Sequence, residues 1–431
     1  MPTTTWEESD SRRWRRALFI FSLLCLGYFL VYFHRLSPAV MALDLMQSFK
    51  TGGAMLGLLG SAYFYPYALM QLPAGLLADS WGPRKSITLF LGIGAVGSLL
   101  FGLAPNFGTA LFARVLVGLG VSMVFIPTMK ILALWFQPRQ FVHLAGFLMT
   151  MGGLGSLSAA APLAWFSRLL GWRLSFILIS GLTAFLAILI WRIIRDHPEE
   201  LGFNPVQQSF LREGEKQIPR LWAGMKQVLS NGYFWPLAIH YFFIGGIFFA
   251  FIGLWGGPYL MQVYGLGKDR AAYVLSLSAL AIIFGSPGFS LLSDRLFKSR
   301  KKILIGSSLM MVLTTLPLML GTALGLFQLC FICLGMGLFS AAIVSVLMTA
   351  TKELFPQAIA GTSTGLVNLF PFLGGAIFQP LIGVILESKS PGTGFFTIKA
   401  YQTAFSLFFY SALLALLATL FMKETFPKNL R

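Results

Sequence analysis

Charge, and acidic charge above all, is scarce in this sequence. Only 11% of the 431 residues are charged, and Asp and Glu together number 15 against 32 Lys and Arg. A soluble globular domain carries about 25% charged residues, so this composition excludes one. Apolar runs of roughly 20 residues, long enough to cross a bilayer as helix, recur throughout, and the short alternating strands of a membrane barrel are lacking. The sequence therefore predicts an all-α polytopic membrane protein.

Cysteine is the next scarcity, with only Cys25, Cys330 and Cys333 in the chain. All three fall in apolar runs, so the C-x-x-C spacing of the last two is expected to serve packing rather than redox or metal chemistry. No metal site and no cofactor is expected. The chain also lacks a recognisable nucleophile–base pair, and we do not expect an enzyme.

The net charge of +17 is explained by topology. Basic residues gather before the first apolar run, after the second, in the central polar segment, after the eighth and at the C-terminus, while the intervening loops hold scattered ones. This alternation follows the positive-inside rule. It predicts a multi-pass protein of the cytoplasmic (inner) membrane with both termini in the cytoplasm, surrounded by lipid and not bound to nucleic acid.

Twelve spans are expected, six in each half of the chain. Their approximate ranges are 17–45, 54–78, 86–103, 109–136, 142–165, 174–194, 233–262, 271–292, 303–321, 324–350, 358–386 and 401–421. The polar, proline-containing stretch between the sixth and seventh spans is predicted to be a linker. The predicted domains are thus an N-terminal bundle (1–194), a cytoplasmic linker (195–232) and a C-terminal bundle (233–431).

The two halves repeat a charged turn. The motif "GLLADSWGPRKS" follows the second span and "SLLSDRLFKSRKK" the eighth, which places Asp79 and Asp294 at equivalent points. An acid among bases at the membrane interface forms ion pairs that are weak enough to break and re-form. We therefore expect a gating role for these turns, although the bases could serve topology alone. The residues concerned are Gly75, Asp79, Gly82, Arg84, Lys85, Asp294 and Arg295.

These features resemble the major facilitator superfamily. The match consists of G-x-L-x-D-x-x-G-x-R-K after the second span, six-plus-six spans, a charged central loop, and "RVLVGLG" with Arg114 in the fourth span. The resemblance implies two six-helix bundles related by a pseudo-twofold axis around a central cavity, with rocking-bundle alternating access. It also implies that Arg114 serves packing and conformational change.

Three bases, Arg35, Arg114 and Lys130, fall inside spans, whereas no acid lies near the centre of one. A charge at bilayer depth costs on the order of 2.5 kcal/mol or more and normally has a partner. For Arg35 we expect that partner to be an anionic ligand; the alternative is the backbone carbonyls of a kink at Pro38. Lys130 is equally consistent with lining the cavity and with a structural role.

Spacing predicts two polar-aromatic helix faces, one on the first span with Arg35 and one on the second span, which together could form a cavity wall. Tyr28, Tyr32 and Arg35 are spaced i, i+4, i+7, and Tyr63, Tyr67 and Gln71 are spaced by four. Arginine and phenols together suit a carboxylate or phosphate. The expected substrate-binding residues are Tyr28, Tyr32, Arg35, Tyr63, Tyr67, Gln71, Lys130, Trp255 and Asn368. His34 is a candidate for proton coupling, against the alternative of a neutral packed histidine.

The stretch "GYFLVYFHR" (27–35) resembles the first-helix signature of the organophosphate:phosphate antiporters, a sugar-phosphate permease-like branch. The resemblance implies substrate contact by Tyr28, Tyr32 and Arg35. The chain departs from that branch at Phe249, where a second arginine is usual, and at Gln71, where a lysine is usual. The related anion:cation symporters carry an acid at the position of His34. These departures favour a monoanion with an apolar body over a phosphate ester.

The sequence thus predicts a monomeric secondary active transporter of small organic anions, with carboxylates as the first choice. Two alternatives stay open. The phenylalanine-rich second half would suffice for an exporter of drugs or other amphipathic compounds. A transporter-shaped sensor is the other, since one member of the resembled branch senses sugar phosphate.

Overall fold

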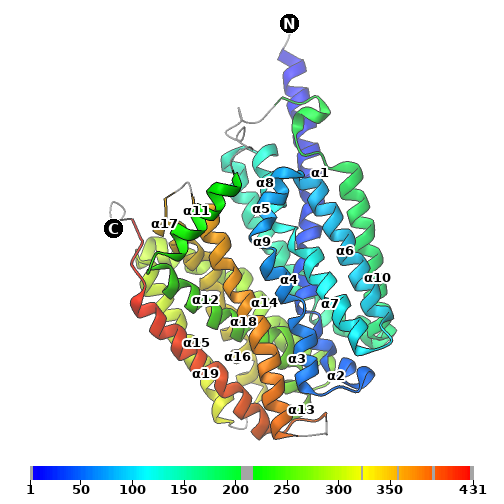
Figure 1. Ribbon diagram of the computed structural model, residues 1–431, viewed down its shortest axis with the longest axis vertical. Helices are drawn as coiled ribbons and strands as arrows, with labels where there is room; N and C mark the ends of the chain where they lie inside the picture. The colour runs from blue at the N-terminus through cyan, green and yellow to red at the C-terminus, as the bar shows by residue number, and fades with distance from the viewer. Residues whose placement is uncertain (1–2, 205–216, 322–323, 357–358, 391–393, 428–431) are drawn as a thin grey trace.

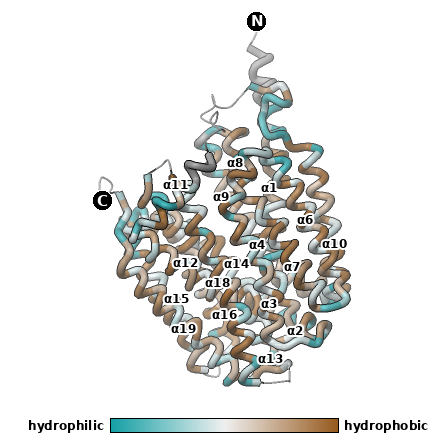
Figure 2. The backbone as a smooth tube through the Cα atoms, in the orientation of Figure 1, coloured by the Kyte–Doolittle hydropathy of each residue, from teal (hydrophilic) through white to brown (hydrophobic). Residues whose placement is uncertain are grey.

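The structure, a computed structural model, describes residues 3–204, 217–321, 324–356, 359–390 and 394–427, so part of the predicted linker lies outside it. Within these ranges all regular elements are helical, and eleven helices are long and apolar enough to cross a membrane. Figure 1 shows them running roughly along the long axis of the molecule, and Figure 2 shows them predominantly apolar along most of their length. The prediction of an all-α polytopic membrane protein is confirmed.

The first half of the chain forms ten helical segments. They are α1 (Thr3–Leu36), α2 (Pro38–Phe49), α3 (Gly53–Ser61), α4 (Phe64–Leu69), α5 (Pro73–Ser80), α6 (Pro83–Leu103), α7 (Phe107–Ser122), α8 (Phe125–Trp135), α9 (Pro138–Ser158) and α10 (Ala161–Ile193).

The second half follows the short helix η1 (Pro198–Leu201). It comprises α11 (Gln217–Leu229), α12 (Phe234–Ala250), η2 (Phe251–Trp255), α13 (Gly256–Tyr264), α14 (Lys268–Leu291), η3 (Leu292–Leu296), α15 (Arg300–Leu320), α16 (Leu326–Ala342), η4 (Ile343–Leu347), α17 (Met348–Leu354), α18 (Ala360–Lys389) and α19 (Ile398–Phe421).

Proline breaks several of the predicted spans, among them the first and the second. The second is divided into α3, α4 and α5, because Pro66 and Pro73 have no N–H to continue a helix from the preceding turn. The three pieces follow one another through the molecule and complete a twelfth crossing that no single helix makes (Figure 1). The first span ends at Leu36 and resumes at Pro38 as α2.

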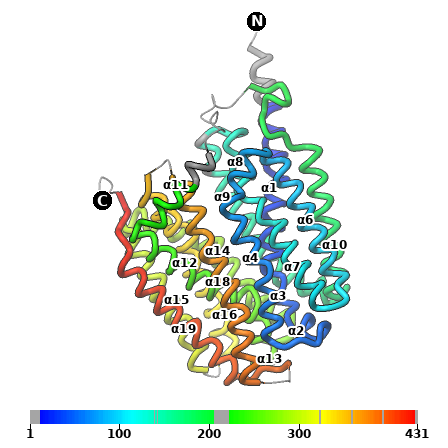
Figure 3. Tube along the Cα trace, viewed as in Figure 1, coloured from blue at the N-terminus to red at the C-terminus, as the bar shows by residue number. Residues whose placement is uncertain are grey.

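The two halves lie side by side, α1–α10 in blue to cyan and green, α12–α19 in green to red (Figure 3). Both ends of the chain and α11 lie at one end of the molecule, and α2, α3 and α13 lie toward the other, which we call the sealed end. There the halves are in close contact. Among the bonds that join them, Ala54 N–H donates to Glu387 Oε2 at 2.9 Å, and Arg168 pairs with Asp269 at 2.6 Å.

Candidate functional site

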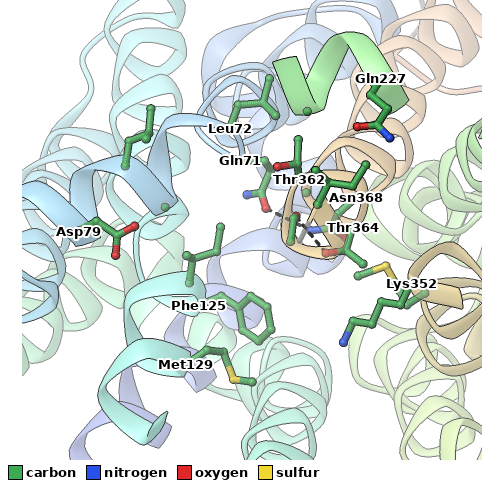
Figure 4. Close-up of a pocket in the computed structure, with 18 of the residues that line it drawn as sticks. Gln71, Leu72, Asp79, Phe125, Met129, Gln227, Lys352, Thr362, Thr364 and Asn368 are labelled. Atoms are coloured by element: carbon green, nitrogen blue, oxygen red, sulfur yellow. Dashed lines mark hydrogen bonds between the residues drawn. The ribbon is translucent and has the colours of Figure 1, made fainter. Parts of the chain in front are cut away.

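A vestibule of about 790 Å³ separates the halves at the end that carries the termini. Its walls come from α5 and α8 of the first half and from α11, α17 and the start of α18 of the second. Figure 4 shows the polar side chains that face it. These lining residues are Gln71, Asp79, Gln227, Lys352, Thr362, Thr364 and Asn368.

The floor of the vestibule is a bond between two amides, one from each half. The Asn368 side-chain N–H donates to Gln71 Oε1 at 3.1 Å, and the Tyr241 hydroxyl donates to Asn368 Oδ1 at 3.4 Å. Gln71 in turn donates to the Tyr67 carbonyl at 3.2 Å. The structure therefore brings Gln71 and Asn368 together, and we call this pair the amide floor.

Arg35 lies behind the amide floor, beside Tyr67, and does not line the vestibule. Its side chain is buried, with 2% of the residue exposed. Four aromatic rings surround the guanidinium carbon: Tyr32 at 4.4 Å, Tyr67 at 4.7 Å, Phe372 at 4.8 Å and Phe249 at 5.6 Å. Because two rings come from each half, the charge lies at the junction of the bundles. We call these four residues the aromatic cage.

The guanidinium of Arg35 has no acidic counterpart. Among the described residues no carboxylate forms a salt bridge with it, and its buried Nε has no hydrogen-bond partner. Cation–π contacts offset part of the cost of burying the charge, each worth about 2 kcal/mol when desolvated. The Tyr63 and Tyr67 hydroxyls lie within hydrogen-bonding reach of the guanidinium, so an anion would bind it beside these two phenols.

The two remaining predicted tyrosines form the next layer around the cage. Tyr28 packs edge-on against Tyr32 and donates to Met149 Sδ at 3.6 Å. Tyr63 stacks on Tyr67 and donates to the Val31 carbonyl at 3.2 Å. The predicted Trp255 lies elsewhere: it is fully buried and donates to the Gln379 carbonyl at 2.9 Å, toward the sealed end.

Arg114, and not Arg35, reaches the kink at Pro38. Pro38 has no N–H, so it cannot donate to the carbonyl of His34, four residues earlier. Arg114 Nη1 donates to that carbonyl at 3.1 Å, from a side chain that is itself buried. The Ser37 hydroxyl donates to the same carbonyl at 3.2 Å, so Arg114 and Ser37 together satisfy the kink that could have engaged Arg35. The His34 ring is buried, and neither of its nitrogens has a hydrogen-bond partner in the described chain.

The charged turn after the second span is built around Asp79. Lys130 Nζ binds Asp79 Oδ1 at 2.6 Å and the Ala78 carbonyl at 3.0 Å, so the structure places this lysine in the turn and not beside Arg35. Gly75 lines the vestibule, and Lys85 is exposed.

The start of α6 is fixed by a carboxylate that follows the sixth span. Asp196 Oδ1 accepts from the Arg84 N–H at 2.7 Å, and Arg84 Nε donates to the Trp191 carbonyl at 3.0 Å. Gly82 has φ +87°, and a Cβ there would clash with Asp196 Oδ2. Burial raises the pKa of the Asp196 carboxyl above its ordinary value, although the bond from Arg84 acts in the opposite direction.

The second half repeats this device at the start of α15. Glu424 Oε1 accepts from the Arg300 N–H at 3.0 Å, as Asp196 does from Arg84. The Arg300 guanidinium binds Asp294, and it also binds both carboxylate oxygens of Glu353, at 2.9 and 3.2 Å. Arg295, predicted as a gating residue, is exposed, and Arg300 is the base that the sequence did not single out.

We expect Glu424→Gln to lower the melting temperature, by an amount corresponding to about 1 kcal/mol, the usual cost of a lost helix cap. Burial would raise the Glu424 pKa, but hydrogen bonds from Ser299 and from the backbone outweigh it and lower that pKa. This contribution to stability is present above the ordinary carboxyl pKa and is lost as pH falls through the lowered value. Melting curves of the two proteins between pH 3 and 7 should therefore converge at the acid end; a constant difference would contradict the assignment.

Two other residues of the site were missed from the sequence. Phe372 lies four residues after Asn368 on α18, so helical spacing placed it on the same face. No spacing pattern in the sequence indicated that Tyr241 belongs to the site.

Comparison with known proteins agrees with this architecture. The model of the Major Facilitator Superfamily matches residues 24–379. The chain is 25% identical over 415 residues to the membrane sensor protein UhpC of Salmonella typhimurium, covering 92% of this chain and 90% of the relative. It is 25% identical over 409 residues to the hexuronate transporter of Escherichia coli strain K12, covering 90% and 91% respectively. It is 24% identical over 368 residues to the probable galactarate/D-glucarate transporter GudP of the same strain, covering 79% and 80%.

Among solved structures, a bacterial homolog of the human lysosomal transporter Spinster matches with a TM-score of 0.76 at 18% identity. The match covers 94% of this chain and 98% of that one.

Proposed function

This chain belongs to the Major Facilitator Superfamily, and from that premise we propose that it transports small organic carboxylates. The observation that carries the proposal is the arginine at the junction of the two halves. Arg35 is buried, surrounded by four rings and unpaired with any carboxylate of the described chain. The planar guanidinium fork is well matched to two kinds of ligand, carboxylates and phosphates.

The surroundings of Arg35 favour a carboxylate over a phosphate ester. Phe249 and Phe372 occupy the side of the cage contributed by the second half. That side therefore offers no second arginine to neutralise the second charge of a dianion. Amide and phenol groups of Gln71, Asn368 and Tyr241 lie close by and can bond to hydroxyl groups. The names of two relatives, a hexuronate transporter and a probable galactarate/D-glucarate transporter, support hydroxylated acids as the substrate class.

The proposed transport cycle is a rocking of the two bundles about this site. With both termini in the cytoplasm, the vestibule opens to the cytoplasm and the sealed end faces outward. The cage joins rings of both bundles, so an anion bound to Arg35 contacts both and can stabilise an intermediate closed on both sides. We propose that a single chain suffices, in the inner membrane. Coupling to protons through His34 stays a prediction.

A thermal-shift panel followed by uptake tests this function. In purified protein we expect millimolar D-glucuronate, a monoanion, to raise the melting temperature, because a ligand that binds only the folded state stabilises it. Glucose 6-phosphate and cationic drugs are expected to have smaller effects. Proteoliposomes should then take up the acid that gives the largest shift. A shift only with cationic drugs would overturn the proposal in favour of an exporter.

A sensor of organic anions is the second candidate, supported by the match to a membrane sensor protein over most of the chain. It uses the same Arg35 site but requires no flux. Saturable binding of the acid together with uptake no greater than in empty liposomes would identify this case.

A further inference from the structure

Gln379 carries a buried oxygen that forms no hydrogen bond. The residue lies on α18 and is 1% exposed. Its side-chain Nε2 donates to the Phe249 carbonyl at 2.9 Å, whereas its Oε1 has no hydrogen-bond partner among the described residues. The opposite orientation of the amide would set two oxygens against each other, so the bond to Phe249 fixes which atom lacks a partner. Burying an acceptor without a donor is costly, and it calls for an explanation.

Three levels of contact between the halves follow one face of α18. Asn368, Phe372 and Gln379 are four and seven residues apart, which places them on that face. Asn368 binds Gln71 at the amide floor, and the Phe372 ring centroid lies 4.6 Å from that of Tyr67 at the cage. The start of α18 lines the vestibule and its far end contacts the sealed end. The level of Gln379 therefore lies on the side of the cage toward the sealed end.

At this third level the residue opposite Gln379 is a glycine. It is Gly60 of α3, and a Cβ there would lie 2.3 Å from Gln379 Oε1. The amide oxygen thus occupies the notch that the glycine leaves. Because α3 belongs to the first half, it withdraws from Gln379 when the sealed end opens in the proposed rocking of the halves. The oxygen then faces the space between the halves, where it can meet a donor.

Phe249 links Gln379 to the Arg35 site. Its ring centroid lies 5.6 Å from the Arg35 guanidinium carbon, and its carbonyl holds the Gln379 amide. Leu36 and Gln379 also flank Gly253, where a Cβ would lie 3.5 Å from Leu36 Cδ2 and 3.4 Å from Gln379 Nε2. The amide therefore lies at the edge of the cage, close to the end of the helix that carries Arg35.

We propose that Gln379 is a specificity-determining residue: its side-chain oxygen accepts a hydrogen bond from a hydroxyl group of the acid whose carboxylate binds Arg35. This inference rests on the proposed function and adds to it a group that distinguishes hydroxylated from plain carboxylates. A site built to bond a hydroxyl rejects analogues that lack it, because its buried polar group is then left without a partner. The rings of the cage alone would favour the more apolar acid.

Equilibrium binding of two acids tests this role. D-glucuronate carries a six-membered ring, a carboxylate and several hydroxyls, whereas cyclohexanecarboxylate has only the ring and the carboxylate. The ratio of their dissociation constants measures selection for hydroxyls and cancels effects that are common to both acids. Gln379→Met keeps the length of the side chain and removes the acceptor. We expect it to lower this selectivity about fivefold, the loss of one neutral hydrogen bond, while cyclohexanecarboxylate binds no more weakly than before.

The matched control is Gln402→Met, because the Gln402 amide also donates to a carbonyl, that of Leu320 at 3.3 Å, away from the site. It should change neither dissociation constant. Gln379→Asn keeps an amide that is one methylene shorter and should give an intermediate ratio, which tests the role even if the methionine variant does not fold. Melting temperatures without ligand show which variants fold. An unchanged ratio in the folded Gln379 variants would overturn the proposal, and so would equal weakening of both acids, which indicates packing.

The two proposals fail differently. Arg35→Gln should weaken both acids alike, because they share the carboxylate that it binds. If both acids depend on Arg35 but their ratio is the same in wild type and in the Gln379 variants, the specificity role alone is removed. If neither acid depends on Arg35, the proposed function is removed, whatever Gln379 does.

Discussion

Arg35→Gln is expected to weaken binding of organic acids by about 30-fold or more and to abolish uptake. The guanidinium is buried and has no other anionic partner in the described chain, so a bound carboxylate would form a desolvated, charge-assisted pair with it. Removing one member of such a pair costs about 2–5 kcal/mol, and each 1.4 kcal/mol is a factor of about ten in affinity. Equilibrium binding of the acid that gives the largest thermal shift measures this directly.

Arg35→Lys is the matched variant, because it keeps the charge but loses the planar fork and much of the stacking on the cage. We expect it to retain weak binding, between wild type and Arg35→Gln. Melting temperatures without ligand show whether either variant is misfolded. If a folded Arg35→Gln protein bound the acid within threefold of the wild-type affinity, Arg35 would not anchor the substrate. The aromatic cage would then serve only to pack the two halves together.

Part of this site could be predicted from the sequence because it depends on one helix at a time. The scarcity of acids predicted that Arg35 lacks an acidic partner. Helical spacing predicted that Tyr32 shares a face of the first span with Arg35, and that Tyr67 shares a face of the second span with Gln71. The twelve crossings followed from apolar runs alone.

Other parts could not be predicted, because they depend on contacts between segments far apart in the chain. Arg114 reaches a carbonyl 80 residues earlier, so nothing local distinguished its role from that of Arg35. Gln71 and Asn368 are 297 residues apart and belong to different halves of the chain. Their hydrogen bond depends on how the two halves pack, which spacing along one helix does not predict.

Gly57→Leu is expected to prevent closure of the sealed end. A Cβ at Gly57 would overlap the Gln379 carbonyl oxygen and lie 2.6 Å from Pro380 Cα, both backbone atoms of α18 in the other half. Backbone in a packed helix cannot yield as a flexible side chain does, and overpacking of this kind costs about 1–3 kcal/mol or more. The clash arises only when the sealed end is closed, so we expect the variant to fold normally and favour the opposite conformation.

The matched control is Gly92→Leu, since Gly92 also lies in a membrane helix but a Cβ at that position would meet no other atom within 4 Å. A cysteine in place of Thr364, on the vestibule wall, reports the conformation. In Gly57→Leu, a membrane-impermeant thiol reagent applied from the vestibule side should label it at least about fivefold more slowly, which requires a shift of about 1 kcal/mol or more. Uptake should be lost, while Gly92→Leu keeps both properties. The clash can affect transport only by changing the conformation that the labelling measures. Normal labelling together with lost uptake would therefore contradict the prediction and show that Gly57 is needed for a reason other than closure.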